Sequence, residues 1–437
     1  MRSKATKLGA GVLSVLVPMM ATMTANAMEP LSSLRYNLAG GPVNFDARLR
    51  YEHVKLGDPL AAGMTEDTAD ATTLRVRLGY TTAKWNELVA QIEYEGLSVI
   101  GGQDFNSFAN GETTYPVVAD AKLNELNQAW IRWSGLPKTD VKYGRQRILL
   151  DNQRFIGNVG WRQTEMTYDA ALLSTAFIPK TKFTYAFLNN VNSFRFFDYD
   201  PTAAVSLSTN VDIEGHLFNA SITAIRDKLV ITPYAYLLDF DDIPAGAPSA
   251  RLFQDTATYG ARVSGAVPFK TDYTFSYALE YAEQKDYQDA PKSIDFNYLL
   301  VEPTVAYKKL VKGTLGYEKL EGDGVNSLQT PLATAHAFVG WADLFLITPQ
   351  VGLERSYVSI STTIDRFGAT AVYHKFESDE GGVKMGDEID LLASFAVIPN
   401  FVLYAKYAAY SADGGAPAAG KPVADVDKTW VYAEYKF

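Results

Sequence analysis

The last eleven residues of the chain alternate between apolar and polar side chains. The apolar face holds Val431, Ala433, Tyr435 and Phe437, and the opposite face holds Lys428, Trp430, Glu434 and Lys436. A period of two indicates a β-strand with one apolar and one polar surface. A strand of this kind that ends on a terminal aromatic residue is typical of the closing strand of a bacterial outer-membrane barrel.

The same alternation recurs along most of the chain, as in residues 45–52, where apolar and charged residues take turns. Because lipid offers the backbone no hydrogen-bonding partner, such strands persist in a membrane only when the sheet closes on itself. The sequence therefore predicts an all-β fold, a single transmembrane antiparallel up-and-down β-barrel of 18 strands. The expected strands lie near 45–52, 74–80, 88–95, 124–133, 139–147, 165–178, 182–190, 211–224, 228–238, 255–267, 271–284, 296–308, 311–320, 354–363, 366–377, 387–397, 400–410 and 428–437. Sixteen strands is the alternative, because 165–178 and 296–308 alternate less cleanly.

Residues 1–27 have the pattern of a secretory signal peptide. A basic start precedes an apolar run from Leu8 to Met20, and Ala25-Asn26-Ala27 supplies a small-x-small cleavage site. Removing the three basic residues of this segment leaves 37 Lys and Arg against 50 Asp and Glu, a net charge of −13. This balance argues against a nucleic-acid partner, and the absence of cysteine excludes disulfides. We expect residues 28–437 to form one barrel surrounded by outer-membrane lipid.

Two connections, 148–165 and 321–353, are too long to be simple hairpin loops. They carry aromatic, Arg and Pro residues rather than the composition of a flexible linker. We therefore expect both to be ordered segments that fold over or into the mouth of the barrel and narrow its bore.

The chain resembles the alginate-export family of outer-membrane channels at three places. These are Tyr143-Gly-Arg-Gln-Arg-Ile-Leu-Leu-Asp-Asn-Gln-Arg-Phe-Ile-Gly157, continued by Val159-Gly-Trp-Arg-Gln163 and Tyr168-Asp-Ala170; the stretch from Thr330 to Leu346; and Gly386-Asp-Glu-Ile-Asp390. The resemblance implies an 18-stranded barrel whose arginine-rich constriction passes an anionic uronate polymer. It extends to the wider family, so small sugar acids or organic acids are equally expected as cargo.

Arginine is suited to such a pore, because its planar guanidinium binds carboxylates with two hydrogen bonds and stays charged. Rings of Arg or Lys are also how pores select anions. A charge that faces lipid at mid-depth costs ~2–4 kcal/mol, so strand arginines should face inward. The expected lumenal and selectivity residues are Arg48, Arg50, Arg75, Arg77, Arg132, Arg145, Arg147, Arg154, Arg162 and Arg262. The alternative is that they only form ion pairs that keep a wide polar channel solvated.

Arg145 is the uncertain member of this set, because it lies two and four residues from Tyr143 and Val141 and would share their apolar face of the strand. It would point outward unless a bulge re-aims it, whereas the family resemblance suggests that it points inward. The residues expected to anchor the long loop or to balance the arginines are Asp151, Asn152, Asp169, Glu93 and Glu95. Cation binding by the first three is the weaker alternative, and we predict no metal site and no cofactor.

These features predict a passive channel in the bacterial outer membrane for anionic, carbohydrate-like solutes, and not an enzyme. A general diffusion porin without anion preference is the nearest alternative. An outer-membrane hydrolase would need a Ser–His pair such as His216 with Ser221 or His374 with Ser378, and a surface adhesin would use its long loops. The direction of transport and any periplasmic partner of export or uptake stay open at this stage.

Overall fold

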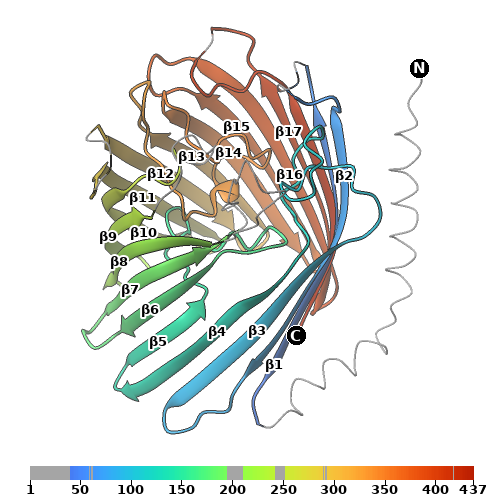
Figure 1. The fold of residues 1–437 in the computed structure, drawn as a ribbon. Helices are drawn as coiled ribbons and strands as arrows, with labels where there is room; N and C mark the ends of the chain where they lie inside the picture. Colours follow the sequence, from blue (N-terminus) through green and yellow to red (C-terminus); the bar gives the residue numbers. More distant parts are fainter. Residues whose placement is uncertain are drawn as a thin grey trace.

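In a computed structural model the chain forms one sheet of 18 strands (Figure 1). The structure describes residues 40–58, 60, 63–193, 210–241, 251–288, 290, 293–416 and 418–437. The predicted signal peptide, residues 1–27, lies outside them. Within the described ranges, no helix is long and apolar enough to cross a membrane.

The strands follow one another around the sheet in chain order. They are β1 (Val43–Leu56), β2 (Thr68–Thr81), β3 (Leu88–Val99), β4 (Leu123–Leu136), β5 (Thr139–Gln146), β6 (Thr167–Thr175), β7 (Thr181–Asn192), β8 (Asn210–Ile225), β9 (Leu229–Phe240), β10 (Thr256–Lys270), β11 (Tyr273–Asp286), β12 (Asp295–Tyr307), β13 (Val311–Leu320), β14 (Leu353–Ile364), β15 (Phe367–Glu377), β16 (Lys384–Ile398), β17 (Phe401–Ala412) and β18 (Val426–Lys436), with one 3₁₀ turn, η1 (Ala335–Ala337).

The sheet closes into a barrel because β1 pairs antiparallel with both β2 and β18. Each neighbouring pair is antiparallel, and the final strand hydrogen-bonds beyond its last pair, from the Phe45 amide to the Phe437 carbonyl at 3.0 Å. Closure leaves no sheet edge whose backbone groups would face lipid without a hydrogen-bonding partner. The predicted 18-stranded antiparallel barrel is confirmed, and the alternative of 16 strands is wrong.

Short turns and long connections lie at opposite ends of the barrel. Two residues, Asp365 and Arg366, join β14 to β15, whereas residues 321–352 join β13 to β14. β1 starts and β18 ends at the short-turn end, and outer-membrane barrels place short turns in the periplasm and long loops outside the cell. The short-turn end is therefore the periplasmic end.

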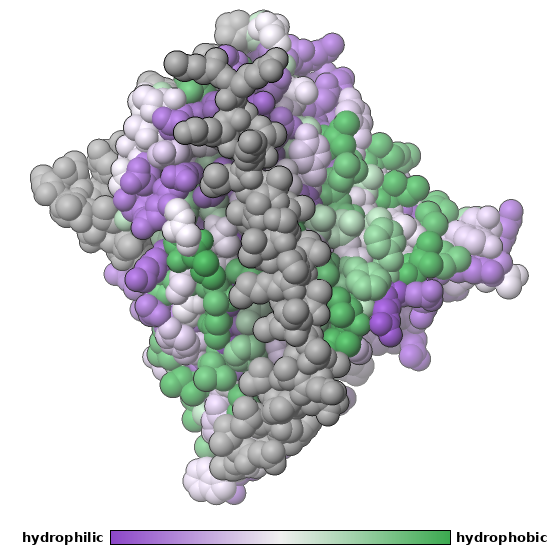
Figure 2. Space-filling view, turned by 90° about the vertical axis from the view of Figure 1, so that its right-hand side faces the viewer, coloured by the Kyte–Doolittle hydropathy of each residue, from purple (hydrophilic) through white to green (hydrophobic). Residues whose placement is uncertain are grey.

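Alternation separates the two faces of the wall. Arg77 is 6% exposed whereas the next residue, Leu78, is 52% exposed, because one faces inward and the other outward. Figure 2 shows hydrophobic residues gathered over the outer surface of the strands, with hydrophilic residues concentrated toward the upper end, which carries the long loops. This outer apolar surface is what a lipid-facing barrel requires.

β2 begins at Thr68, six residues before the strand expected from the sequence. Its first residues are small and polar and lack the apolar alternation. Ala69 and Ala71 are buried all the same, because they pack against Phe105 and Val118 of the β3–β4 connection. At the extracellular end of β2, packing against a loop rather than contact with lipid therefore sets the residue at which the strand begins.

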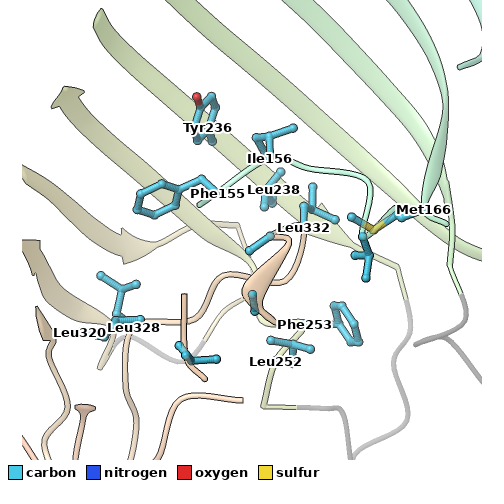
Figure 3. Close-up of a cluster of buried hydrophobic side chains, with 14 of the residues drawn as sticks. Phe155, Ile156, Met166, Tyr236, Leu238, Leu252, Phe253, Leu320, Leu328 and Leu332 are labelled. Atoms are coloured by element: carbon cyan, nitrogen blue, oxygen red, sulfur yellow. The ribbon is translucent and has the colours of Figure 1, made fainter. Parts of the chain in front are cut away.

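The interior of the barrel is filled in part by two loops. We call residues 147–166 the first inner loop and residues 321–352 the second inner loop. Their apolar residues join inward-facing wall residues in one large buried cluster. Figure 3 shows Phe155 and Ile156 of the first loop beside Tyr236 and Leu238 of β9, with Leu332 of the second loop close by. Both loops thus fold inward, as their composition suggests.

Candidate functional site: the charged junction of the inner loops

The two inner loops are joined backbone to backbone. The Gly157 amide donates to the Leu332 carbonyl at 2.8 Å, and the Thr334 amide donates to the Gln153 carbonyl at 3.0 Å. Asp151, Gln153 and Val159 adopt positive φ, which turns the first loop sharply enough to stay inside the wall. These bonds fix the position of every charged side chain that the two loops carry.

Four of the predicted arginines form a patch on the inner face of β1 and β2. Arg48 lies directly opposite Arg75 in the strand register, and all four side chains are buried. Arg48 pairs with Glu434 of β18 at 2.9 Å and donates to the Trp161 carbonyl at 3.0 Å. The other pairings are Arg75 with Asp46, Arg77 with Glu95, and Arg50 with the Trp161 carbonyl. The patch therefore holds the first inner loop against the wall.

Three further predicted arginines belong to the first inner loop itself. Arg147 pairs with Glu93 at 2.6 Å and also with Glu165. Arg154 pairs with Glu318 of β13 at 2.5 Å and donates to Thr330. Arg162 lies 3.2 Å from both Glu52 and Asp343. Each of these arginines therefore connects the loop to a wall strand or to the second loop.

The remaining three predicted arginines lie away from this junction. Arg262 pairs with Glu280 at 2.7 Å on the opposite wall, and Arg132 is the most exposed, 4.0 Å from Asp140. Arg145 makes a two-bond pair with Asp169 at 2.8 and 2.9 Å. The uninterrupted ladder between β5 and β6 keeps Arg145 on the face of the exposed Tyr143, so its charge is outside the lumenal patch.

The predicted anchoring residues have varied partners. Glu93 accepts from Arg147, Asn127 and Gln128, whereas Asp151 accepts from Asn219 of β8 at 2.7 Å rather than from an arginine. Asn152 accepts from the Arg154 amide at 3.2 Å and so shapes the turn locally. The partners of Asp169 and Glu95 are Arg145 and Arg77. Among the described residues, no three His, Asp or Glu side chains are grouped as metal ligands.

Sequence reasoning missed a second part of the junction, around Lys406 of β17. The Lys406 ammonium lies 3.8 Å from the centroid of Trp341 and 5.1 Å from those of Trp161 and Trp430. It also bonds His336, whose other ring nitrogen lies 2.7 Å from Asp343. Strand parity would have placed Lys406 inside the barrel, but nothing in the sequence indicates its aromatic surroundings.

Two carboxylates, Glu388 and Asp390, also hold the second inner loop. In the sequence they were noted only as part of a family motif. The Ala342 amide donates to Glu388 at 2.8 Å, and the Trp341 amide donates to Asp390 at 3.3 Å. Both acids are inward-facing residues of β16. They accept from backbone groups that would otherwise be buried without partners.

The loop carboxylates are strongly influenced by their cationic neighbours. Burial by itself would raise the pKa of Glu165, but Arg77 and Arg147 outweigh burial and hold that pKa at about 2. The pKa of Asp343 is likewise lowered, because His336 and Lys428 outweigh its burial. Burial lowers the pKa of His336 well below its ordinary value. Glu165 and Asp343 are therefore ionised at pH 7, and His336 is neutral.

A closed 18-stranded wall with an apolar exterior and a charged, loop-filled interior defines an outer-membrane β-barrel of the porin class. Residues 43–290 match the family model for alginate export. The chain belongs to the alginate-export family, and the localisation expected from its sequence, the bacterial outer membrane, is confirmed. No curated protein matches the chain by sequence.

Solved porins share the fold at low sequence identity. OccAB2 of Acinetobacter baumannii is 14% identical, with a TM-score of 0.67 over 90% of this chain and 97% of that one. OpdK of Pseudomonas aeruginosa, solved with vanillate, is 11% identical, with a TM-score of 0.64 over 90% and 98%. A BenF-like porin from Pseudomonas fluorescens Pf-5 is 12% identical, with a TM-score of 0.65 over 91% and 98%. At these identities the likeness concerns the fold alone.

Proposed function

We propose that this protein is a passive channel for anionic, carbohydrate-like solutes, either a uronate polymer or small sugar and organic acids. The family supports a uronate cargo, and vanillate, the compound named with OpdK, is a small carboxylate. In this proposal the inner loops narrow the bore, and lumenal guanidinium groups attract the carboxylates of the solute.

The observation that carries this proposal is the arginine patch on β1 and β2. Like charges directly opposite each other on neighbouring strands destabilise a sheet, yet Arg48 faces Arg75 across the β1–β2 ladder. Arg50 and Arg75 also each keep Nε and Nη1 without a hydrogen-bond acceptor among the described residues. Buried donors of this kind favour an anionic acceptor, and carboxylates fit a guanidinium well.

Planar-bilayer recordings test the proposal directly. In a potassium chloride gradient, the reversal potential should indicate preference for chloride, and replacing Arg75 and Arg77 by Ala should reduce that preference. The control is Arg226→Ala, which removes an exposed cation, paired with Asp227, from a periplasmic turn. A preference for potassium in the unaltered channel contradicts the proposed function.

A general diffusion porin is the second candidate, and one observation favours it. Most lumenal arginines are matched with carboxylates, as with Arg77 and Glu95 or Arg262 and Glu280. Liposome swelling separates the two functions, because a general porin admits neutral and anionic sugars of equal size at equal rates. An anion channel admits the acid faster.

Three of the four serine and histidine residues considered for a hydrolase have other partners. His374 bonds Asp390 at 3.1 Å, and the Ser378 hydroxyl donates to the Glu380 carbonyl at 2.7 Å. His216 bonds the Tyr185 hydroxyl at 2.9 Å. These contacts give the hydrolase alternative no support.

A further inference from the structure

The periplasmic mouth of the barrel carries lysines that differ from the arginines of the junction. Lys142, Lys182 and Lys312, here called the mouth lysines, lie on β5, β7 and β13. Lys182 and Lys312 are the second residues of their strands, and Lys142 is the fourth residue of β5, roughly 10 Å along the strand at ~3.3 Å per residue. All three therefore lie near the periplasmic opening.

The strand register places each of these side chains on the inner face. Lys142 is opposite Arg132, between the exposed outward residues Val141 and Tyr143. Lys182 is opposite Ser221, two residues from Asn219, whose side chain reaches the first inner loop. Lys312 is opposite Ser361 and Ala306, two residues from Thr314, which bonds Thr304 across the lumenal face at 2.9 Å.

The charges of the junction arginines are largely neutralised. Within ion-pair distance, Arg48 has Glu434, Arg77 has Glu95 and Arg147 has Glu93. Arg154 and Arg162 are paired with Glu318 and with Glu52 in the same way. At a distance greater than a few ångströms, such pairs present little net charge to a passing ion.

The mouth lysines are not neutralised in this way. In the part of the chain that the structure describes, none of the three ammonium groups has a carboxylate within 4.0 Å. Lys142 lies 4.8 Å from the centroid of the Trp130 ring, which leaves its charge uncompensated. The acid on its face, Asp140, is occupied by the Ser134 hydroxyl at 2.5 Å and by Arg132.

From this contrast we infer that anion selection resides mainly at the periplasmic mouth, where Lys142, Lys182 and Lys312, spaced around the inner face, each attract carboxylates of an acidic saccharide. This inference rests on the proposed anion channel and assigns the larger part of its selectivity to the mouth lysines, with a smaller part left to the arginine patch. Uncompensated charges that line an opening raise the local concentration of anions before they reach the junction. The paired arginines then serve mainly to hold the inner loops.

The same three hairpins supply a matched control. Lys138, Lys180 and Lys309 lie in the turns next to β5, β7 and β13, beyond the ends of the strands, and are exposed. Replacing each triplet by Gln removes the same charge from the same end of the barrel. Only the mouth triplet removes charge from the inner face of the strands.

The experiment compares reversal potentials of the unaltered channel and of the two triple variants, after heat-modifiable gel mobility has established that each is folded. Lys142→Gln, Lys182→Gln and Lys312→Gln together should abolish most of the anion preference. Lys138→Gln, Lys180→Gln and Lys309→Gln together should leave the preference unchanged. Oligogalacturonate added at the periplasmic side should block the unaltered channel, and the mouth variant should lose that block.

The outcomes separate the two proposals. An unaltered channel without anion preference overturns the proposed function. An anion-selective channel whose preference survives in the mouth variant, but is lost in the Arg75→Ala and Arg77→Ala variant, leaves the proposed function standing and overturns the mouth site. Equal block by oligogalacturonate in the mouth variant and the unaltered channel overturns the mouth site as well.

Discussion

The indole of Trp161 lies flat against the imidazole of His336, with ring centroids 3.3 Å apart and planes 10° from parallel. One ring belongs to the first inner loop and the other to the second. Arg162 lies over the same indole, 4.4 Å from its centroid. This single stack therefore joins both loops to the charged side chains that fix them in the lumen.

Replacing Trp161 by Ala should release the two loops from each other. Trp161 is half-buried, so its removal should cost less than the ~3–5 kcal/mol of a fully buried aromatic, and the loss falls on loop docking rather than on strand pairing. Single-channel recordings should show larger and more variable conductance. Trp85→Ala, which removes an exposed indole from a periplasmic turn, is the control and should behave as the unaltered protein.

The buried pair of Arg154 and Glu318 gives a second prediction. Replacing Arg154 by Ala removes one of the two cations beside Glu318 and leaves it with Arg355, at 3.0 Å, and the Tyr298 hydroxyl, at 2.9 Å. Loop docking should weaken by up to about 3–5 kcal/mol. Limited proteolysis should then cleave the first inner loop in folded barrels. Equal protection of the Arg154→Ala variant and the unaltered protein would contradict the assignment.

Alternation predicted the wall of the barrel well, because lipid imposes a strict rule on every second residue of a strand. Arg48, Arg50, Arg75 and Arg77 are buried on the inner face as their phase predicts. Arg145 shows where a second source of inference misleads. Its parity predicts the outward face that the strand register gives it, whereas the family resemblance suggests the opposite.

The partners inside the lumen follow no such rule. Asp151 reaches Asn219 and Trp161 reaches His336 only because the loops turn at Asp151, Gln153 and Val159. Those turns depend on contacts between segments far apart in the sequence, so a local pattern does not contain them. The same reason explains why the aromatic surroundings of Lys406 were missed, although its inward direction follows from parity.

Acidification should loosen the junction through His336. Burial lowers the pKa of this imidazole in the docked loops, whereas a released loop restores a pKa of about 6.5. The released state therefore binds more protons below about pH 6.5, and docking weakens by up to about 1.4 kcal/mol per pH unit. Asp343, whose pKa is lowered in the docked state, adds a further loss below about pH 3.9.

Conductance noise recorded between pH 7 and pH 5 checks this pH dependence. Noise should increase toward pH 5 in the unaltered channel and should increase much less in His336→Gln, which cannot gain the proton. A His216→Gln variant removes an outer-face histidine instead and serves as the control. A pH response that persists in full after His336→Gln would assign the effect to another group.

The last prediction concerns Gly144, at the point where the pairing of β5 with β4 ends. Its φ of +118° lies where L-residues are strained, and a Cβ there would stand 2.3 Å from the Ala129 carbonyl oxygen. Gly144→Ala should cost at least about 2 kcal/mol of strain and shift the end of β5, with loss of the Arg145–Asp169 pair. Gly313→Ala is the control, because a Cβ at that position of β13 meets open space. Heat-modifiable mobility after refolding into detergent should show a smaller folded fraction for Gly144→Ala than for Gly313→Ala, and equal fractions would show that the wall tolerates a side chain at residue 144.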